Sequence, residues 1–352
     1  MDYVISGIQQ VGIGVPDVDR AWAWYRCYFG MDVPVFREAA PAPLMTRYTD
    51  GVVQQRDAAL VLNLQGGGGM EIWQYTSRTP QPPAFSPALG DLGLLAARIK
   101  SRDVGRMHAW LATQQLPGLG PLHVDPSGRP HFFVRDPYSN LFQVVPSATW
   151  FSKTKHLSGG PTGCLIGVRD INRALSLYAG VLGYDRVLYD ERGVFKDLSV
   201  LPGGDRTVRR VLLGHYAERE GPFSRLLGPT QLELVQALDG TPPPRPLFGD
   251  RLWGDLGFIH LCYDVQGMDA LRARCEQAGF PFTVDSANSF DMGEAAGRFS
   301  YIEDPDGTLI EFVETHKVPI LKKRGWYLDV RKRNPRKPLP NWMLKALGLN
   351  RV

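Results

Sequence analysis

The chain has 352 residues, of which 43% are hydrophobic, 11% aromatic and 22% charged, a composition typical of a globular protein with one or two domains. No run approaches the roughly 18 consecutive apolar residues that a membrane-spanning helix needs, and the opening residues lack a basic region followed by an apolar stretch. The four cysteines form no CxxC pair, which argues against a disulfide framework and against a cysteine zinc site. We therefore expect a cytoplasmic protein rather than a secreted or integral membrane protein.

The net charge of +4 conceals a strong asymmetry along the chain. Residues 317–352 contain eleven Lys and Arg but a single acid, Asp329, so this tail carries +10 and the rest of the chain −6. Because residues 1–316 are mildly acidic, binding to a polyanion would be expected of the tail alone.

Internal repeats organise the rest of the chain. The segment GVPDVDRAWAWYRCYFGM, which begins at Gly14, returns as GVRDINRALSLYAGVLGY from Gly167, a constant offset of 153 residues. Later, RDPYSNLFQVV from Arg135 matches EDPDGTLIEFV from Glu303. These matches predict two copies of one domain and a basic tail, with bounds of 1–150, 156–316 and 317–352.

Each copy divides again into two modules with the same order of elements. In the second copy the run 163–170 alternates as a strand does, and apolar residues spaced three or four apart predict a helix over 171–182. Asp170 is the expected N-cap of this helix, and Gly183 is the expected left-handed residue at its end. The last module, from 257 to 316, repeats the strand and the helix and adds three strands. The unit is βαβββ, and it is present four times.

With these motifs the sequence resembles the vicinal oxygen chelate superfamily, which includes glyoxalase I, methylmalonyl-CoA epimerase, the extradiol dioxygenases and the bleomycin-resistance proteins. The resemblance covers about residues 5–316 and rests on the repeated GVxDxxRAxxxYxxxxG segment, the DPxGxxxE segment and the fourfold module count. It implies an α+β fold in which four βαβββ modules pair into two cupped mixed sheets, followed by the basic extension.

The resemblance also implies where a metal ion would be bound, because ligands come from the first and last strands of each module. The corresponding positions are Gln10, Glu71, Ala96 and Gln143 in the first copy and Gly163, Glu233, His260 and Glu311 in the second. We expect the second copy to hold one divalent ion (Mn²⁺, Zn²⁺ or Fe²⁺) through Glu233, His260 and Glu311, with Gly163 at the missing position. An unpaired carboxylate turned into a half-buried sheet costs several kcal/mol, so these groups need a cation, a proton or solvent. The plain alternative is that the two glutamates face solvent and that His260 is an ordinary satisfied polar residue.

Three neighbours of the expected site carry competing interpretations. Tyr301 lies ten residues before Glu311 and is either a hydrogen-bond donor to the substrate or an amphipathic strand tyrosine. His215 is either an acid or base that reaches the cup or an exposed hairpin histidine. Cys262 shares a strand face with His260 and is either part of the core or part of the cup lining.

The resemblance implies a substrate with two adjacent oxygens and a metal ion that acts as a Lewis acid on them. A carboxylate must then accept the proton, and Glu233 is the candidate base, which predicts an isomerase, epimerase or lyase. The first alternative is an extradiol-type Fe(II) dioxygenase, although those enzymes use two histidines and one glutamate. The second alternative is a non-catalytic binding protein for small molecules.

The basic tail ends in a short amphipathic helix, NWMLKALGL, which follows three prolines. It is predicted to pack back on the body, to contact an anionic membrane surface, or to bind an anionic partner. No nucleic-acid motif supports the last interpretation, so no nucleic acid is expected. The oligomeric state stays open.

Overall fold

The computed structural model of the chain describes residues 3–240, 242–287, 290–291, 296–321 and 326–352. Within these ranges, every helix is too short or too polar to pass through a lipid bilayer.

The chain folds as four successive modules, in agreement with the predicted repeat. The first comprises β1 (Val4–Gly14), α1 (Val18–Phe29), β2 (Val33–Pro41), a 3-10 helix η1 (Pro43–Tyr48), β3 (Gln55–Leu62) and β4 (Gly69–Tyr75). The second comprises β5 (Gly93–Ser101), α2 (Val104–Thr113), β6 (His123–Val124), β7 (Pro130–Arg135) and β8 (Leu141–Pro146). The third comprises β9 (Ser158–Gly167), α3 (Ile171–Tyr178), β10 (Arg186–Gly193), a 3-10 helix η2 (Lys196–Leu198), β11 (Val208–Gly214), α4 (Ser224–Leu227) and β12 (Gln231–Ala237). The fourth comprises β13 (Gly257–Gln266), α5 (Met268–Gln277), β14 (Val284–Asp285), β15 (Phe290–Asp291), β16 (Ala296–Glu303) and β17 (Leu309–Thr315).

Aspartate side chains start the first helix of three modules. Asp170 accepts hydrogen bonds from the backbone N–H groups of Asn172 and Arg173, as predicted, and Asp17 and Asp103 cap α1 and α2 in the same way. Helix α3 ends at Tyr178, four residues before the predicted end at 182. Residues 179–182 form turns, and Gly183 with φ of 74° follows them rather than ending the helix directly.

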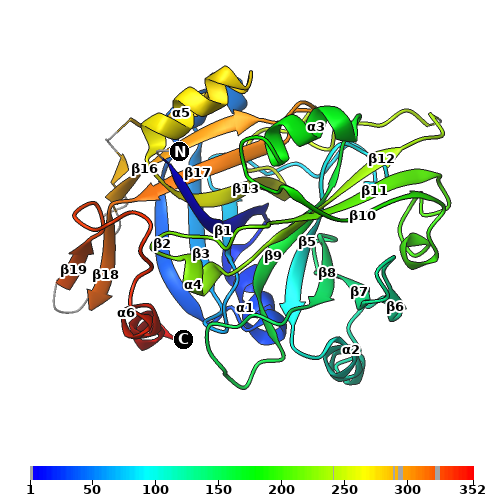
Figure 1. Cartoon of the computed structure of the whole chain (residues 1–352), viewed down its shortest axis with the longest axis horizontal. Coiled ribbons are helices and arrows are strands. Elements are labelled where there is room, and N and C mark those ends of the chain that lie inside the picture. Colours follow the sequence, from blue (N-terminus) through cyan, green and yellow to red (C-terminus); the bar gives the residue numbers. More distant parts are fainter. Residues whose placement is uncertain (1–2, 241, 288–289, 292–295, 322–325) are drawn as a thin grey trace.

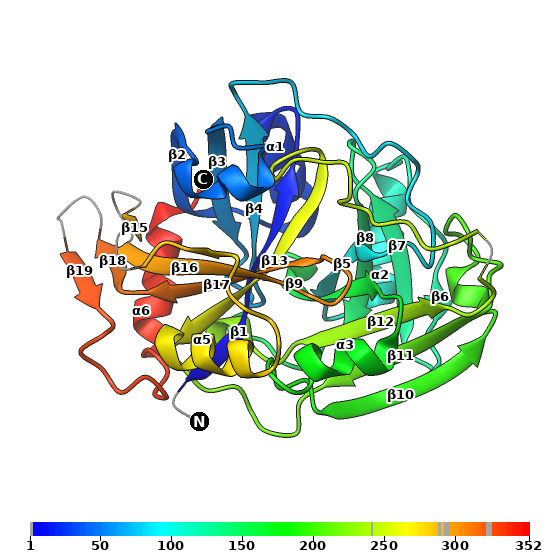
Figure 2. The same cartoon turned by 90° about the horizontal axis from the view of Figure 1, so that it is seen from above.

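The modules pair across the two halves of the chain rather than within them (Figures 1 and 2). One nine-stranded sheet has the order β14-β16-β17-β13-β1-β4-β3-β2, with β15 beside β16, and so joins the first and fourth modules. The other has the order β10-β11-β12-β9-β5-β8-β7-β6 and joins the second and third modules. The expectation that the second copy alone holds the metal ion requires its two modules to share a sheet, and they do not, because β1 pairs with β13 and β5 with β9.

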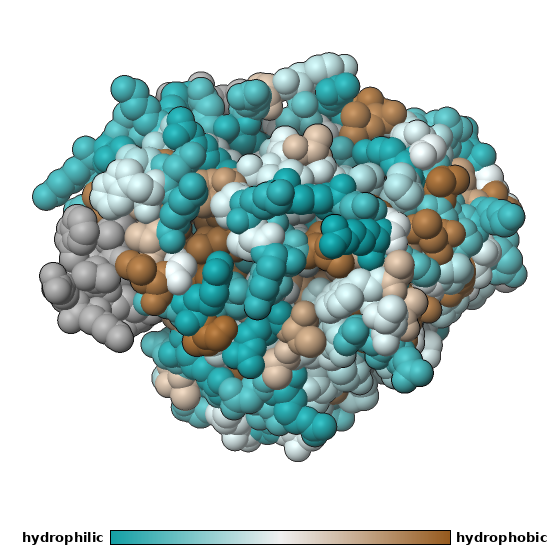
Figure 3. Space-filling model, turned by 90° about the horizontal axis from the view of Figure 1, so that it is seen from below, coloured by the Kyte–Doolittle hydropathy of each residue, from teal (hydrophilic) through white to brown (hydrophobic). Residues whose placement is uncertain are grey.

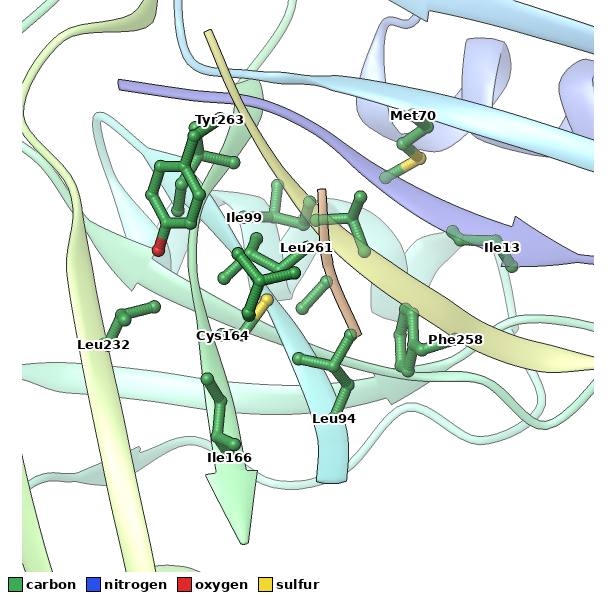
Figure 4. Packing of buried hydrophobic residues seen from close by; sticks show 14 of the residues in the cluster. Ile13, Met70, Leu94, Ile99, Cys164, Ile166, Leu232, Phe258, Leu261 and Tyr263 are labelled. Carbon is green, nitrogen blue, oxygen red and sulfur yellow. The ribbon is translucent and has the colours of Figure 1, made fainter. Parts of the chain in front are cut away.

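The main hydrophobic core lies between the two sheets (Figure 4). Ile13 of β1 and Leu261 of β13 project from one sheet, and Ile99 of β5 and Cys164 of β9 project from the other. Each buried aliphatic side chain of this kind contributes roughly 1.5–3 kcal/mol to stability. Since strand residues alternate between faces, the neighbours of these core residues line the concave side of each sheet, where the candidate sites lie.

The tail forms β18 (Lys317–Leu321), β19 (Trp326–Asp329), α6 (Asn341–Ala346) and a final 3-10 turn η4 (Leu347–Asn350). Leu344 and Leu347 are buried against Val33 and Leu62 of the first module. The first of the three interpretations, packing on the body, therefore agrees with the structure. Membrane contact through the tail stays a prediction.

Candidate metal centre

Strand register brings four of the predicted ligand positions to one place on the concave face of the nine-stranded sheet. Gly12 of β1 pairs with Glu71 of β4 on one side and with His260 of β13 on the other. Cys262 of β13 pairs in the same manner with Gln10 and with Glu311 of β17. Positions two residues apart on a strand share a face, so Gln10, Glu71, His260 and Glu311 converge.

The four side chains are within contact distance. The imidazole Nε2 of His260 lies 3.1 Å from Oε2 of Glu71 and 3.1 Å from Oε2 of Glu311. The amide of Gln10 donates hydrogen bonds of 3.3 Å and 3.4 Å to the same two carboxylate oxygens. The side chain of His260 is 1% exposed, that of Glu311 9% and that of Glu71 13%, so Glu71 is the most accessible of the three.

Electrostatics at this centre favour an additional positive charge. Burial by itself would lower the pKa of His260, but the carboxylates of Glu311 and Glu71 outweigh burial and raise that pKa to about 10. Even with a protonated imidazole, the two carboxylates leave the group at −1. A divalent cation bound to Nε2 would replace this proton and neutralise the group.

The donor set fits a divalent metal ion. One ligand atom each from Glu71, His260 and Glu311 lies within 4.8 Å of the others. In addition, Gln10 Oε1 is buried and has no hydrogen-bond partner among the described residues, and His260 Nε2 is buried between the two carboxylate oxygens without a well-aligned hydrogen bond to either. A buried polar atom without a partner is costly, and one nitrogen with three side-chain oxygens is a set that suits Zn²⁺, Mn²⁺ and similar ions.

Small and aromatic residues shape the space around His260. A Cβ on Gly12 would lie 2.5 Å from Cε1 of the imidazole, so the ring occupies space that only glycine leaves open. The Trp253 ring lies nearly parallel to the imidazole at 6.5 Å, and Trp73 contacts Trp253 with 4.1 Å between ring centroids.

Tyr301 lies beside the metal centre, next to Glu311 on the neighbouring strand and against the imidazole of His260. Its hydroxyl is 3.3 Å from Nδ1 of His260, and burial raises the pKa of this tyrosine well above its usual range. The predicted proximity to Glu311 agrees with the register, in which Tyr301 pairs with Glu311. Donation to a substrate oxygen stays a prediction, and the observed partner is the histidine.

Cys262 is fully buried next to Glu311, burial and the carboxylate of Glu311 raise the pKa of its thiol well above the usual range, and this thiol lies 3.6 Å from the amide oxygen of Gln9. Both interpretations of Cys262 therefore apply: the residue is buried as a core residue is, and it lies on the strand face that carries His260.

Glu233 is not part of this centre, and its prediction as ligand and base beside His260 and Glu311 is wrong. It lies on β12 in the other sheet, where Arg210 forms an ion pair of 2.6 Å with its carboxylate and Tyr189 donates a hydrogen bond of 2.8 Å. Burial opposes its charge, but Arg210 and Arg98 outweigh burial and lower the pKa of Glu233. The error follows from the pairing, since the third module faces the second and not the fourth.

The eight-stranded sheet contains the other four predicted positions. They are Ala96, Gln143, Gly163 and Glu233. Arg98 pairs with Gly163 and Gln143 in the register, and its guanidinium is 3.9 Å from Glu233. A metal ion here would meet two buried guanidinium groups, which argues against a second metal centre.

His215 is also outside the metal centre, and the predicted role as acid or base in that cup is wrong. It directly follows β11 in the other sheet, where Nδ1 lies 2.7 Å from the carbonyl oxygen of Gly183 and Nε2 lies 3.2 Å from the hydroxyl of Thr230. Burial, together with the nearby Arg219, lowers the pKa of His215 to about 4. The neutral imidazole thus has a structural role.

Gln10 and Glu71 were among the ligand positions that the family resemblance implies, but they were not expected to join His260 and Glu311. A usable signal was present. Of the eight positions, the four in the first and last modules all carry a donor side chain, whereas the inner modules contain Ala96 and Gly163.

Comparisons with known proteins agree with this architecture. Family models described as Glyoxalase/Bleomycin resistance protein/Dioxygenase superfamily match residues 7–144 and 164–299. Glyoxalase I from Zea mays is 15% identical with a TM-score of 0.54, and the match covers 98% of this chain and 96% of that one. A putative dioxygenase from Bacillus subtilis is 12% identical with a TM-score of 0.56, covering 88% of this chain and 86% of that one. No curated protein matches the chain. At these identities, the likeness to solved structures shows the fold alone.

Proposed function

Because the chain belongs to the Glyoxalase/Bleomycin resistance protein/Dioxygenase superfamily, we propose that it is a metal-dependent enzyme that moves a proton within a small substrate. The substrate class is a molecule with two adjacent oxygens and a C–H bond next to one of them. The reaction class is isomerisation, epimerisation or elimination. Glyoxalase I from Zea mays, which shares the fold, gives this class a precedent.

The observation that carries the proposal is the convergence of Gln10, Glu71, His260 and Glu311 from strands that are far apart in the sequence. Gln10 presents a buried oxygen without a hydrogen-bond partner among the described residues, and His260 Nε2 meets two carboxylates at once. A cluster with a net negative charge and unmet bonds is unfavourable as a purely structural element. A bound metal ion would explain why these four side chains converge.

A bound divalent cation would supply Lewis acidity to two neighbouring substrate oxygens. The protein's own part is to hold the ligand atoms and to move the proton. Glu71 is the proposed base, because its carboxylate is the most accessible of the group. Glu311 lies between Gln10 and His260 and next to Tyr301, so it is the more firmly held carboxylate.

Tyr301 is proposed to orient the imidazole. When Nε2 of His260 binds a cation, Nδ1 carries the proton and can donate it to the Tyr301 hydroxyl at 3.3 Å. The tyrosine therefore selects the tautomer that the metal centre requires. Trp253 and Trp73 exclude water on one side of the ring, which strengthens the charge interactions of the centre.

The dioxygenase alternative has less support, because it calls for two imidazoles and the position of the second is occupied by Gln10. Among the described residues, the group that converges on the centre contains one histidine. A non-catalytic binding protein would use the same metal centre without the need for a base, so the effect of replacing Glu71 distinguishes the two functions.

Solvent exchange of a substrate proton tests the proposal. The protein is loaded with Mn²⁺ or Zn²⁺ and incubated without oxygen in D₂O with α-hydroxy ketones and 2-hydroxy acids, and deuterium uptake is followed by NMR. We expect deuterium at the carbon beside the oxygens with the native protein and a rate at least about 100-fold lower with Glu71→Gln, as for loss of a general base. Exchange that is equal in both proteins, or turnover that requires oxygen, would contradict the proposal.

A further inference from the structure

A second feature of the molecule, away from the metal centre, is a surface hollow of about 1040 Å³. It lies between α1, α2, the segment 153–157 that connects the two halves of the chain, and the residues at 351–352. We refer to it as the basic hollow, and its cationic lining residues are Arg26, Arg106, Lys153, Lys155 and Arg351.

The positive charges of the basic hollow are mostly uncompensated. Asp32 is the acid in its lining, and it is already bound by His156 at 3.0 Å and by Arg351 at 3.1 Å. The other four cationic side chains form no ion pair with the residues that the structure describes. Four like charges around one hollow repel one another, and a bound anion would relieve that repulsion.

Packed aromatic rings form part of the wall of the basic hollow. Tyr28 of α1 and Trp110 of α2 contact each other with 6.0 Å between ring centroids, and Trp24 supports Tyr28 from behind at 5.0 Å. An adjoining hollow of about 610 Å³ shares Lys153 and Arg351 and adds Lys345 of the tail. The positive field therefore extends over a concave surface whose shape is set by packed aromatic rings.

The basic hollow is separate from the metal centre. Helix α1 packs with Tyr25 and Phe29 into the main core between the sheets, whereas the metal ligands face the opposite, concave side of the nine-stranded sheet. The ends of α1 and α2 and the C-terminal end of the chain lie on the lower side of the molecule in Figure 1. The view of that side shows hydrophilic residues over most of its middle (Figure 3).

We propose that the basic hollow binds a small, multiply charged anion of the phosphate-ester or pyrophosphate class. Several unpaired cations at one concave site match the several oxygens of such a ligand, and both guanidinium and ammonium groups bind phosphate oxygens. A flat membrane surface fits less well, because the cations surround a depression that lies between two helices.

Cys27 makes the proposal testable. This residue lines the hollow and is exposed, whereas Cys164, Cys262 and Cys275 are buried. In native protein, alkylation by the uncharged reagent iodoacetamide therefore reports on Cys27. We expect inorganic pyrophosphate to slow the alkylation in a saturable way, and added salt to weaken that protection. The assay is run without added divalent ions, because pyrophosphate binds them.

Charge reversal identifies the cations that hold the anion. In Arg106→Glu/Lys155→Glu, the concentration of pyrophosphate that gives half protection should rise at least about tenfold, since two charge-assisted contacts are lost. The control, Lys332→Glu/Lys337→Glu, changes the net charge equally on exposed tail residues and should behave like native protein. Unchanged thermal unfolding of both variants shows that they fold. The proposal is overturned if pyrophosphate gives no protection, if the hollow variant is protected equally, or if the control loses protection as well.

Discussion

Single residues determine which of the two cups can bind a metal ion. The centre between the first and fourth modules presents two carboxylates, an amide and an imidazole, whereas the equivalent space between the second and third modules contains Arg98 beside Glu233. In one cup an external cation would neutralise the carboxylates, whereas the other cup already contains guanidinium cations that are part of the chain. The two cups share one repeated backbone plan, so this difference in side chains is the reason that only one of them is a candidate metal centre.

Tyr301→Phe tests the proposed orientation of His260. The variant keeps the ring and removes the hydroxyl that lies 3.3 Å from Nδ1. Loss of a supporting hydrogen bond to a metal-bound histidine weakens metal binding by about 10- to 100-fold. We expect that loss in a metal titration, while the midpoint of urea unfolding of the metal-free protein changes little. Tyr189→Phe, which removes a hydroxyl from Glu233 in the other cup, should leave metal affinity unchanged. An effect of equal size in the two variants would contradict the role of Tyr301.

Glu233→Gln tests the assignment of the second cup as a structural ion-pair network. The substitution leaves Arg210, which is fully buried, with Asp197 as its remaining acidic partner at 2.9 Å. Breaking a buried pair by removing one partner costs about 3–5 kcal/mol. We expect that loss in chemical denaturation, with no change in metal content. A variant that stays stable and loses its metal would restore Glu233 as a ligand.

His215 predicts a dependence of stability on pH. Its pKa in the folded protein is about 4, below the ordinary value of 6.5, because burial opposes the charged form. The unfolded chain therefore binds a proton between pH 6.5 and 4 while the folded chain does not, so this residue lowers stability as pH falls through that window. The contribution to the slope is at most about 1.4 kcal/mol per pH unit.

The measurement is the difference in unfolding free energy between native protein and His215→Gln at a series of pH values. We expect the difference to shift in favour of the variant as pH falls from 6.5 to 4. A difference that stays constant across this range would show that His215 titrates normally in the folded protein.

At the scale of elements, the decisive feature is which modules share a sheet. The sequence was sufficient for the βαβββ unit and for its four copies, because apolar spacing, Asp170 and the constant offset of 153 residues can be recognised without knowledge of the strand pairing. The eight expected ligand positions came from the family resemblance. The sequence was not sufficient for the pairing of β1 with β13, since the contacts between these strands connect residues about 250 positions apart. Glu233 was placed in the wrong cup for that reason, although its position on the strand was correct.

The helix in the tail also shows that a local apolar pattern does not determine which surface a helix packs against. The apolar side chains of α6 were recognised in the sequence, but an apolar surface can face the body or a membrane with the same pattern. The choice depends on the partner surface, which Val33 and Leu62 provide on the first module.

Leu344→Ala tests the packing of α6. The side chain is buried in contact with the body, so its truncation should lower the unfolding free energy by about 2–4 kcal/mol. Leu349 lies five residues later and is 70% exposed, and Leu349→Ala should cost less than about 0.5 kcal/mol. Equal effects of the two substitutions in urea unfolding would contradict docking of the tail.

At the scale of the whole molecule, the chain is a closed arrangement of two unequal cups around a shared core. The outer modules build the proposed metal centre, and the inner modules build a buried network of Arg210, Asp197, Glu233 and Arg98. Two pairs of modules within one chain complete both cups, so the proposed centre needs no residue from a second copy. We therefore predict one metal ion per chain.

Metal content is the most direct test of this account. Native protein, His260→Ala and Glu233→Gln are incubated with Zn²⁺ or Mn²⁺, separated from free ions by gel filtration and subjected to elemental analysis. We expect about one ion per chain in native protein and in Glu233→Gln, and about a tenth of that or less in His260→Ala, because loss of one ligand commonly weakens binding by an order of magnitude or more. An equal load in all three proteins, or loss of the ion in Glu233→Gln alone, would contradict the account.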